Sequence, residues 1–286
     1  MKILILGGDG YLGWPTAMQL AEHDHEVYIV DNYSRKMLSK KTLSEALFET
    51  KTMDEKCEIF KLHTGKRIRC KEIDCSNYIE LSKIVKSFQP DAVIHYAEQP
   101  SAPYSMLGYG EAKFTLDNNV GTTLSILWAI KEFAPNCHIV KLGTMGEYGT
   151  PEIDIEEGWL EVSHKGRSDK FLYPRQASSL YHTSKILDTD LIWFYVRTYG
   201  LRVTDLMQGP VYGLITPETK LADELMPHFH YDDIFGTVVN RFLVQAIAGI
   251  PLTIYGRGEQ KRGYLNLIDT LNCVELAVMN PPDIGE

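Results

Sequence analysis

The sequence has no run of eighteen apolar residues, few cysteines and a shortage of positive charge. Without a long apolar run, no membrane-spanning helix is predicted. The 29 Lys and Arg residues are outnumbered by 38 Asp and Glu residues, which gives a net charge of −9. An acidic chain is unsuited to nucleic acid or an anionic membrane as its main partner, although a small anionic ligand needs only local positive groups.

The five cysteines are odd in number and scattered along the chain. Cys70 and Cys75 lie five positions apart, but no second pair matches them. We therefore predict reduced thiols in a cytoplasmic protein, without a structural zinc site. The segment HFHYDD (228–233) offers His228 and His230 as metal ligands, but a mobile loop over a substrate is the favoured interpretation.

Apolar runs alternate with helical patterns through most of the chain. Strands are predicted at 2–6, 26–30, 67–73, 91–97, 137–143 and 201–207, and helices at 11–22, 78–88, 109–134 and 177–199. This alternation predicts parallel strands with helices on both faces, and near-continuous apolar runs fit strands buried on both sides. The expected fold is an α/β doubly wound parallel sheet of the Rossmann type.

The pattern loosens after residue 208. Residues 251–256 (PLTIYG) predict a short strand between two helical patterns. We expect residues 1–208 to form mainly the sheet domain, and residues 209–286 mainly a smaller C-terminal lobe for substrate. The chain stops soon after its last helical pattern, at PPDIGE, so we expect this lobe to be incomplete at its C-terminal end.

A glycine-rich turn, GGDGYLG (7–13), joins the first predicted strand to the first predicted helix. Its glycines fit two spacings of the dinucleotide-binding pattern: Gly8, Gly10 and Gly13 fit GxGxxG, and Gly7, Gly10 and Gly13 fit GxxGxxG. Such glycines allow a tight turn and let backbone N–H groups approach a pyrophosphate at the helix N-terminus. An ordinary tight turn is the alternative, but the strand before it and the helix after it favour a dinucleotide site.

The second predicted strand is followed by Asp31, eighteen residues beyond the last glycine of the turn. A carboxylate there accepts hydrogen bonds from ribose hydroxyls and repels a 2′-phosphate, so NAD is favoured over NADP. Arg35 is the counter-argument, although Asn32 and Arg35 could also simply line the adenosine. Two residues after the third strand are expected beside the adenine, with a plain loop as the alternative: Asp74 and Cys75.

The sequence YHTSK places Tyr181 and Lys185 four positions apart on a predicted helix, and therefore on one face of it. A nearby ammonium favours the phenolate and lowers the pKa of a tyrosine, so Tyr181 can act as a general base on a sugar or alcohol hydroxyl. Thr144, after the fifth strand, can hydrogen-bond the same oxygen. This spacing alone also fits a surface helix, but beside a dinucleotide turn it indicates a redox site.

With these motifs the chain resembles the extended short-chain dehydrogenase/reductase superfamily of nucleotide-sugar enzymes, and within it the UDP-sulfoquinovose synthase family. The resemblance covers nearly the whole chain and is carried by GGDGYLGWPTA (7–17), HYAEQPSAPYSM (95–106), KLGTMGEYGTPEIDIEEG (141–158), QASSLYHTSK (176–185), TDLMQGPVYG (204–213), FGTVVNRF (235–242) and YGRGEQKRGYLNLIDT (255–270). The run TMGEYGTPEIDIEEG is much more specific than the superfamily motifs.

The resemblance implies a reaction in which NAD is bound tightly and recycled. C4 of UDP-glucose is oxidised with Tyr181 as the base, and the 4-ketone makes the C5 proton labile. Loss of that proton and of the 6-hydroxyl leaves a 4-keto-5,6-ene, to which sulfite adds at C6 before C4 is reduced again. The implied product is UDP-sulfoquinovose, and the enzyme need only position groups and manage protons.

The loop after the fifth strand departs from the 4,6-dehydratases, which typically carry TDEVYG and use its Asp and Glu as acid and base. This chain has TMGEYG, with Met145 at the Asp position and Gly146 at the Glu position. Glu147 becomes the candidate proton carrier for elimination; otherwise it shapes the loop by accepting backbone N–H bonds. Met145 could keep the C6 region apolar or only fill a gap. His182 could donate a proton at C6 or face elsewhere on its helix.

The resemblance also implies further contacts with both ligands. The cofactor contacts are Tyr11, Leu12, Tyr96, Asn118, Lys185, Gln208 and Val211. The sugar-nucleotide contacts are Gln99, Asn118 or Asn119, Thr144, Tyr181, Gln208, Arg241, Tyr255, Gln260 and Arg262. Arg262 is the expected pyrophosphate ligand, since a guanidinium can bind phosphate oxygens bidentately. Tyr255 is expected beside the uracil, whereas Arg241 and Gln260 could also be solvated surface residues.

Two departures from the family pattern concern the substrate. The family motif EQRSAPYS reads EQPSAPYS here, so Pro100 replaces a cation near the substrate. Family members also usually continue beyond residue 286 and supply another phosphate-binding arginine. By analogy, the helices at 109–134 and 177–199 imply a homodimer.

Two other functions remain open at this point. One is a different NAD-dependent nucleotide-sugar enzyme, either a 4-epimerase or a 4,6-dehydratase. The other is a non-catalytic NAD-binding regulator on the same fold, which the presence of Thr144, Tyr181 and Lys185 disfavours.

Overall fold

The computed structural model describes residues 1–44, 46–156, 158–258 and 261–286. Its centre is a six-stranded sheet in the order β3-β2-β1-β4-β5-β8, in which every neighbouring pair is parallel. The strands are β1 (Lys2–Leu6), β2 (Glu26–Asp31), β3 (Ile68–Glu72), β4 (Ala92–His95), β5 (His138–Thr144) and β8 (Arg202–Gln208). This order, which reverses between β1 and β4, is that of a doubly wound dinucleotide-binding sheet and confirms the predicted fold class.

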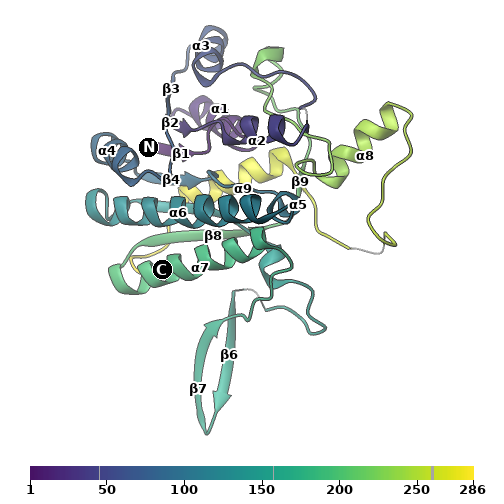
Figure 1. Cartoon of the computed structure of the whole chain (residues 1–286). Coiled ribbons are helices and arrows are strands. Elements are labelled where there is room, and N and C mark those ends of the chain that lie inside the picture. The colour runs from purple at the N-terminus through teal and green to yellow at the C-terminus, as the bar shows by residue number, and fades with distance from the viewer. Residues whose placement is uncertain (45, 157, 259–260) are drawn as a thin grey trace.

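Helices cover both faces of the sheet (Figure 1). The first face carries α4 (Tyr78–Phe88), α6 (Tyr109–Phe133) and α7 (Leu180–Tyr199), and the second carries α1 (Gly13–Glu22), α3 (Met53–Thr64) and α9 (Leu267–Met279). Within β1, Leu4 and Leu6 point into the first core, and Ile3 and Ile5 point into the second. Successive side chains of a strand alternate between faces, which is why an uninterrupted apolar run is needed here.

The C-terminal segment contributes to both parts of the molecule. Helix α9 packs in the second core through Val274 and Val278, while α8 (Val238–Ile247) stands beside the sheet (Figure 1). Residues 251–256 form loop and turn with exposed side chains, so the short strand predicted there is wrong. The division at residue 208 stays a prediction.

The short elements lie mostly on loops around the carboxyl edge of the sheet. They are α2 (Ser34–Lys41), α5 (Ala102–Ser105), the 3-10 turns η1 (Met145–Tyr148) and η2 (Asp223–Leu225), and the paired strands β9 (Val211–Tyr212) and β10 (Leu265–Asn266). Because parallel strands all end at this edge, the loops that follow them meet there.

An antiparallel hairpin, β6 (Trp159–His164) and β7 (Arg167–Leu172), projects from the body of the molecule beyond α7 (Figure 1). At its base, the Trp159 ring meets that of Trp193 on α7 edge to face, with centroids 4.7 Å apart. The sequence analysis did not predict this hairpin, because its residues are mostly polar and exposed.

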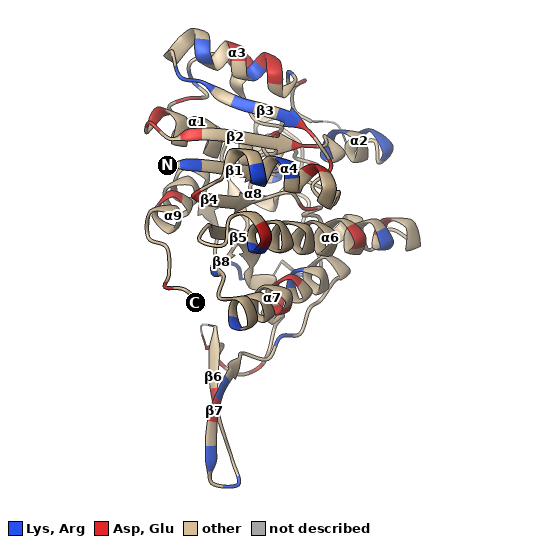
Figure 2. Cartoon of the chain, turned by 90° about the vertical axis from the view of Figure 1, so that its left-hand side faces the viewer, with Lys and Arg blue, Asp and Glu red and all other residues tan. Residues whose placement is uncertain are grey.

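The charged residues are spread over the surface rather than gathered by sign. Lys and Arg alternate with Asp and Glu along α3, α6 and α7 on the side that Figure 2 shows. In the described ranges, no helix is both long and apolar enough to cross a bilayer.

Candidate functional site

A cavity of about 460 Å³ lies at the carboxyl ends of the central strands. Its walls come from the turn after β1, the ends of β2, β4, β5 and β8, the start of α7, and the segment 233–238. The topological switch between β1 and β4 lies at its centre, which is where ligands bind in sheets of this kind. Most of the predicted site residues line this one cavity, as follows: Gly7, Gly10, Tyr11, Leu12, Gly13, Asp31, Asn32, Arg35, Asp74, Cys75, Tyr96, Asn118, Thr144, Tyr181, Lys185, Gln208, Val211, Arg241 and Tyr255.

The glycine turn has no room for side chains where it meets its neighbours. Gly7 has a φ of +83°, and a Cβ there would lie 2.7 Å from the carbonyl carbon of Tyr96. A Cβ on Gly13 would overlap the backbone of Gly7, so α1 starts directly against the turn. Helix α1 begins at Gly13, and its N-cap residue Leu12 makes no side-chain cap. Both residues line the cavity, so the N-terminus of α1 lies at the cavity wall, and the turn fits a dinucleotide pyrophosphate.

Asp31 is fixed at the end of β2 by two backbone donors. Its Oδ2 accepts from the N–H of Asp9 at 2.9 Å, and its Oδ1 accepts from that of Tyr33 at 2.8 Å. Burial, and then the Asp9 carboxylate, raise the pKa of Asp31 to about 6. Asp31 is therefore ionised at neutral pH, lines the cavity, and fits ribose hydroxyls better than a 2′-phosphate.

The cation near Asp31 is held by other partners. Arg35 donates from Nη2 to the Phe235 carbonyl oxygen at 3.2 Å, and its guanidinium lies 4.2 Å from the centre of the Phe235 ring. Burial lowers the pKa of Arg35 to about 10. The neighbouring Asn32 accepts from the N–H of Ser34 at 3.0 Å. These contacts weaken the argument for NADP that Arg35 raised in the sequence.

Asp9 is a residue of the turn that the sequence analysis did not single out. Its carboxylate pairs with the ammonium groups of Lys56, at 2.6 Å, and Lys36, at 2.7 Å. Lys56 is fully buried, so Asp9 supplies the counter-charge that this cation needs. The two helices that carry the lysines lie far along the chain from the turn, and for this reason no local pattern revealed the contact.

At the adenine end, Asp74 shapes the loop after β3. Its Oδ1 accepts from the backbone N–H of Ser76 at 2.9 Å and from the Ser76 hydroxyl at 2.7 Å. Burial raises the pKa of the Cys75 thiol well above its usual range, so Cys75 is a neutral wall of the cavity. Both residues line the cavity, and their position beside an adenine stays a prediction, because the loop role also accounts for Asp74.

The predicted redox residues converge from two elements. Thr144 ends β5, and its Oγ1 accepts from the N–H of Gly146 at 3.1 Å. Tyr181 lies in the first turn of α7 and Lys185 in the next, and all three residues line the cavity. Helix α7 is capped by Ser179, whose Oγ accepts from the N–H of His182 at 3.2 Å.

The expected effect of Lys185 on Tyr181 is not seen. Burial, and then the Glu98 carboxylate, raise the pKa of Tyr181 above its ordinary value. The Lys185 ammonium donates to Glu98 and to the Leu142 carbonyl oxygen, so its charge is already compensated. The pKa of Tyr181 is therefore raised overall, whereas the sequence analysis expected it to be lowered.

Glu98 and His95 are cavity residues that the sequence analysis missed. His95 ends β4 and Glu98 follows three residues later. His95 Nε2 lies 3.8 Å from Glu98 Oε1 and 3.1 Å from the Thr123 hydroxyl. Burial lowers the pKa of His95 to about 4, so its imidazole is neutral. An acid directly after a buried strand, in HYAEQP, was the signal that could have drawn attention to Glu98.

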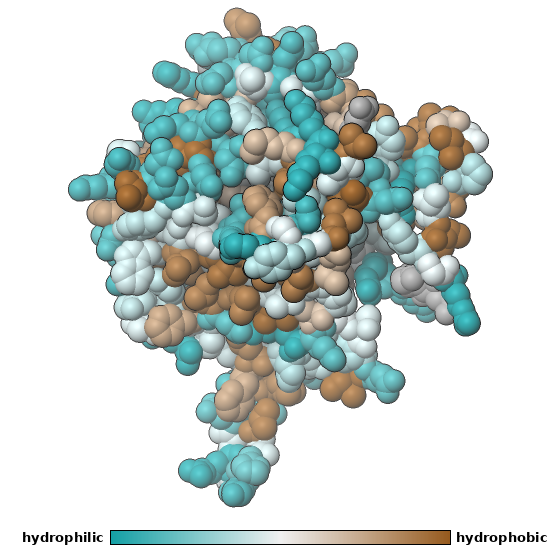
Figure 3. Space-filling view, viewed as in Figure 1, coloured by the Kyte–Doolittle hydropathy of each residue, from teal (hydrophilic) through white to brown (hydrophobic). Residues whose placement is uncertain are grey.

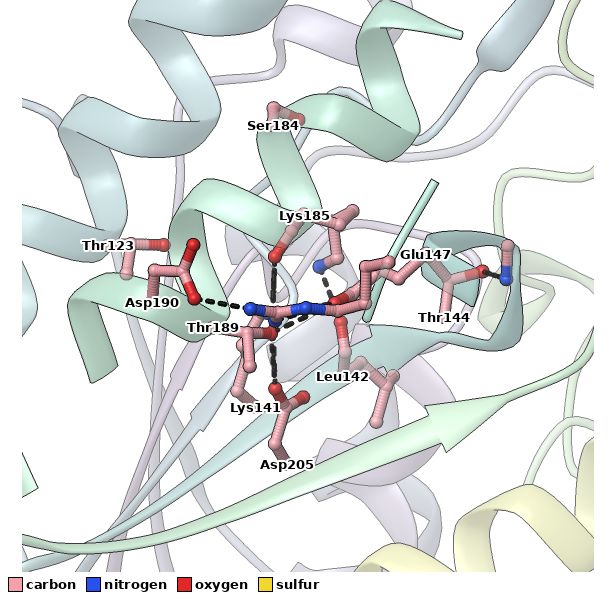
Figure 4. A network of polar contacts seen from close by, with 12 residues as sticks. Thr123, Lys141, Leu142, Thr144, Glu147, Ser184, Lys185, Thr189, Asp190 and Asp205 are labelled. Carbon is pink, nitrogen blue, oxygen red and sulfur yellow. Dashed lines mark hydrogen bonds and ion pairs between the residues drawn. The ribbon is translucent and has the colours of Figure 1, made fainter. Parts of the chain in front are cut away.

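Glu147 does not lie where a proton carrier for the sugar was expected. Its side chain is fully buried and is not part of the cavity wall. It accepts from the Thr189 hydroxyl at 3.1 Å and lies 3.6 Å from Arg175 and 3.9 Å from Lys141. Figure 4 shows this network between α7 and the strands β5 and β8. The position favours the alternative in which Glu147 shapes the loop, but through side chains instead of backbone donors.

His182, in contrast, faces the loop that replaces the dehydratase motif. It lines the cavity, and its Nδ1 lies 3.0 Å from the Ser179 hydroxyl. A Cβ on Gly146 would come within 3.0 Å of His182 Nε2, closer than real Cβ atoms come. Burial, and then the charge of Arg262, lower the pKa of His182, so the neutral imidazole dominates near pH 7. Met145 is 39 % exposed and lies beside the cavity rather than in its wall.

The remaining predicted substrate residues divide into lining and supporting groups. Arg241 is buried and donates to the Asp233 carboxylate at 3.0 Å and to the Tyr255 hydroxyl at 3.2 Å, so it is not a solvated surface residue. Gln99 is buried behind the wall, where its amide donates to Thr115 at 2.8 Å. Arg262 lies on an exposed segment, and Gln260 lies outside the described residues.

The segment around HFHYDD crosses the edge of the cavity. His228 lines the cavity, and the His228 and His230 rings meet with centroids 4.6 Å apart. The backbone N–H of Leu47 donates to the Phe229 carbonyl oxygen at 2.9 Å, which ties this segment to the N-terminal half. Over the part of the chain that the structure describes, no group of three or more His, Cys, Asp or Glu residues could hold a metal ion.

Comparison with known proteins extends these observations. A sequence model of the NAD dependent epimerase/dehydratase family matches residues 3–285. The chain is 48% identical over 285 residues to a chloroplastic UDP-sulfoquinovose synthase of Spinacia oleracea, covering 100% of this chain and 59% of that protein. It is 45% identical over 287 residues to a UDP-sulfoquinovose synthase of Sulfolobus acidocaldarius, covering 100% of this chain and 73% of that one.

Solved structures show the same fold at lower identity. The UDP-glucuronic acid 4-epimerase of Bacillus cereus, in complex with UDP-glucuronic acid and NAD, superposes with a TM-score of 0.71 at 21% identity, covering 99% of this chain and 75% of that one. The UDP-glucose 4-epimerase of Thermus thermophilus, in complex with NAD, gives a TM-score of 0.67 at 22% identity, covering 98% and 75%.

Proposed function

The chain belongs to the NAD-dependent epimerase/dehydratase family, and we propose that it converts UDP-glucose and sulfite to UDP-sulfoquinovose. The observation that carries this proposal is a single cavity in which a dinucleotide turn and Asp31 meet Thr144, Tyr181 and Lys185. The substrate choice is supported by two relatives named UDP-sulfoquinovose synthase, which share nearly half of their aligned residues with this chain.

The turn around Gly7, the start of α1 and Asp31 would hold the pyrophosphate and the adenosine ribose of NAD. Asp31 favours NAD over NADP because an ionised carboxylate repels a 2′-phosphate. When bound in this cavity, NAD supplies the acceptor for a hydride from C4 of the glucose and returns the hydride at the end of the cycle. Lys185 and Tyr181 stand on one face of α7, so both can reach the reacting end of the cavity.

Tyr181 takes the proton from the 4-hydroxyl of the sugar, and Thr144 holds the same oxygen by a hydrogen bond. Both side chains line the cavity, and Thr144 is kept in place by the N–H of Gly146. Tyr181 must also give the proton back when C4 is reduced. Tyr181 therefore serves as base and acid in one turnover.

For the elimination we propose His182 as the group that moves the proton. The 4-ketone makes the C5–H bond labile, and a neutral imidazole can take that proton and pass it to the leaving 6-hydroxyl, which departs as water. His182 is neutral, lines the cavity, and has Nε2 beside Gly146, where a dehydratase carries its glutamate. Glu147 is assigned instead to holding the loop against α7 and β5.

A homodimer through α6 and α7 is part of the proposal. Apolar side chains gather over this region in the space-filling view (Figure 3). The exposed ones on α6 and α7 include Leu124, Trp128, Leu187 and Phe194. Exposed apolar surface of this kind on two adjacent helices is typical of a protein–protein contact.

A cytoplasmic location is likewise a proposal, and it rests on the five free thiols.

The test is a product assay with the purified protein, NAD, UDP-glucose and sulfite. A sulfonated nucleotide sugar, detected by mass spectrometry, supports the proposal. UDP-galactose alone indicates an epimerase, and a 4-keto-6-deoxy sugar formed with or without sulfite indicates a dehydratase. The Tyr181→Phe variant is the control: it should keep bound NAD and lose all products.

A further inference from the structure

Glu98 is a buried carboxylate that the proposed reaction has not used. It follows β4, lines the cavity, and its side chain is 5% exposed. Its Oε2 accepts from the Lys185 ammonium, whose second acceptor is the Leu142 carbonyl oxygen. Its Oε1 is buried and finds no hydrogen-bond partner among the described residues. Burying an ionised carboxylate with one oxygen unpaired costs free energy, which points to a role for Glu98 through the charged groups beside it.

The groups around Glu98 come from every element packed against it. Lys185, Asp188 and Tyr181 lie on α7, His95 at the end of β4, and Lys141 on β5. Burial would raise the pKa of Glu98, but Lys185, His95 and Lys141 bring it below its usual range, so Glu98 stays ionised.

Lys185 and Asp188 respond to the same pair. Burial alone would lower the pKa of Lys185, but Glu98 and Asp188 carry it above its ordinary value. Burial, and then the Glu98 charge, raise the pKa of Asp188 to about 7. Glu98 is thus the main fixed negative charge that both Lys185 and Tyr181 experience at the end of the cavity.

We propose that Glu98 is a positioning residue that holds Lys185 in an ion pair and favours the phenol form of Tyr181, so that Tyr181 keeps the proton that it must give back in the return step. This inference rests on the proposed function. A positive nicotinamide ring favours the phenolate of Tyr181 while C4 is being oxidised. Once a hydride has neutralised that ring, Glu98 is left as the dominant charge and favours the phenol.

The protons and electrons balance without a further reactant. In oxidation the C4–H bond breaks with its electron pair going to NAD, and the 4-hydroxyl proton forms a bond with the Tyr181 oxygen. In the return step the hydride comes back to C4, and the Tyr181 O–H bond breaks to restore the 4-hydroxyl. Glu98 and Lys185 keep their charges throughout, so their effect on Tyr181 is the same in both directions while the charge of the cofactor changes.

The first measurement needs no turnover. The pH at which Tyr181 ionises is taken from the phenolate absorbance of the protein minus that of its Tyr181→Phe variant. In Glu98→Gln this ionisation should move to lower pH by on the order of one unit, a tenfold change in the ionisation constant. Asp205→Asn is the matched control, because Asp205 is a carboxylate near Lys141 at 3.4 Å and not a partner of the Lys185 ammonium. An equal shift in Asp205→Asn, or no shift in Glu98→Gln, would overturn the proposal.

The second measurement follows NADH in the loaded enzyme. With UDP-glucose alone, Glu98→Gln should accumulate about tenfold more bound NADH than the wild type, because a lower pKa leaves less of Tyr181 in the phenol form that returns the proton. Glu98→Asp, which restores the charge, should move this value back toward the wild type. Unchanged NADH in a folded Glu98→Gln protein with normal NAD content contradicts the inference. If the wild type forms no NADH at all with UDP-glucose, the proposed function fails, and the titration still decides the role of Glu98.

Discussion

At the scale of single residues, the account depends on how burial sets the charge of a few side chains. Asp31, His182 and Tyr181 line the same cavity, yet burial moves each of them toward its neutral form. The identities of these residues were readable in the sequence. Their charges depend on which groups surround them, and those groups come from distant parts of the chain.

The first residue prediction concerns the pH dependence of NAD binding. Asp31 has a pKa of about 6, so it is protonated below that pH. The neutral carboxyl no longer repels a 2′-phosphate, and it no longer accepts two ribose hydrogen bonds as an anion. The affinity for NAD should be constant above about pH 7 and fall as the pH drops through 6, and titration calorimetry can follow it. Asp31→Asn should bind NAD roughly ten- to a hundredfold more weakly at pH 8 and show a flatter pH profile.

The free energy of unfolding of the protein without NAD should change with pH in the direction opposite to the affinity for NAD. The folded pKa of Asp31 lies above its unfolded value of about 4, so its stabilising contribution is fully present below pH 4 and lost as the pH rises through 6. Comparing the melting temperature of the wild type with that of Asp31→Asn isolates this contribution. If the affinity for NAD falls equally in the wild type and in Asp31→Asn as the pH is lowered, the titration of Asp31 does not control NAD binding.

The second residue prediction separates His182 from Glu147. His182→Gln should still form NADH with UDP-glucose but lose sulfonated product by about a hundredfold or more, because the proton carrier of the elimination is gone. Glu147→Gln should lower the melting temperature, since it disturbs the buried contacts of Lys141 and Arg175. The opposite pattern, with elimination lost only in Glu147→Gln at an unchanged melting temperature, would return the role to Glu147.

At the scale of elements, the loop after β5 and the start of α7 work as one unit. Gly146 in the 3-10 turn η1 leaves room for the His182 ring on α7. A substitution in the loop therefore acts on the helix.

Gly146→Ala should displace His182 and reduce elimination by about a hundredfold, while NADH formation from UDP-glucose continues. Gly110→Ala is the control, because nothing lies within 4 Å of a Cβ there and α6 tolerates alanine better than glycine. Product and NADH assays on the two variants check this. Equal activities in Gly146→Ala and the wild type would show that the space beside His182 has no function.

The elements also show how far the sequence could go. The inner strands β1, β2, β4 and β5 were predicted because both of their faces are mostly buried, so apolar runs such as KILIL favour one interpretation. The β6–β7 hairpin was missed, because both of its faces meet solvent and its residues carry no apolar period. The strand predicted at 251–256 was wrong because its apolar residues are exposed, and the segment forms loop and turn.

Contacts between residues far apart in the sequence could not be predicted either. The Glu98–Lys185 pair joins residues 87 positions apart, and Asp9 in the glycine turn pairs with Lys56 on α3. Lys141 sits inside an apolar strand pattern, where a sequence gives no reason to expect a fully buried cation. Sequence alone therefore identified the proposed catalytic groups, but not the neighbouring charges that set their pKa values.

At the scale of the whole molecule, α6 and α7 form an exposed apolar surface on the side opposite the sheet core. Replacing Phe194 by Glu places a charge on this surface, where a dimer contact would have to bury it. Sedimentation should then show a monomer at concentrations where the wild type is a dimer, with bound NAD retained. Lys61→Glu on α3, a change at an already charged and exposed position on the other face of the sheet, serves as the control. A wild-type protein that sediments as a monomer would contradict the dimer.

The chain spans 59% of the length of the spinach relative and 73% of the archaeal one. The central claim is that this cavity carries out oxidation at C4 and elimination across C5 and C6 in one cycle. It is tested most directly by running the reaction with UDP-glucose and sulfite in deuterium oxide and locating deuterium in the product by NMR. The account predicts a sulfonated sugar with deuterium at C5 and the original hydrogen at C4. A product with unexchanged hydrogen at C5, or only UDP-galactose, would contradict it.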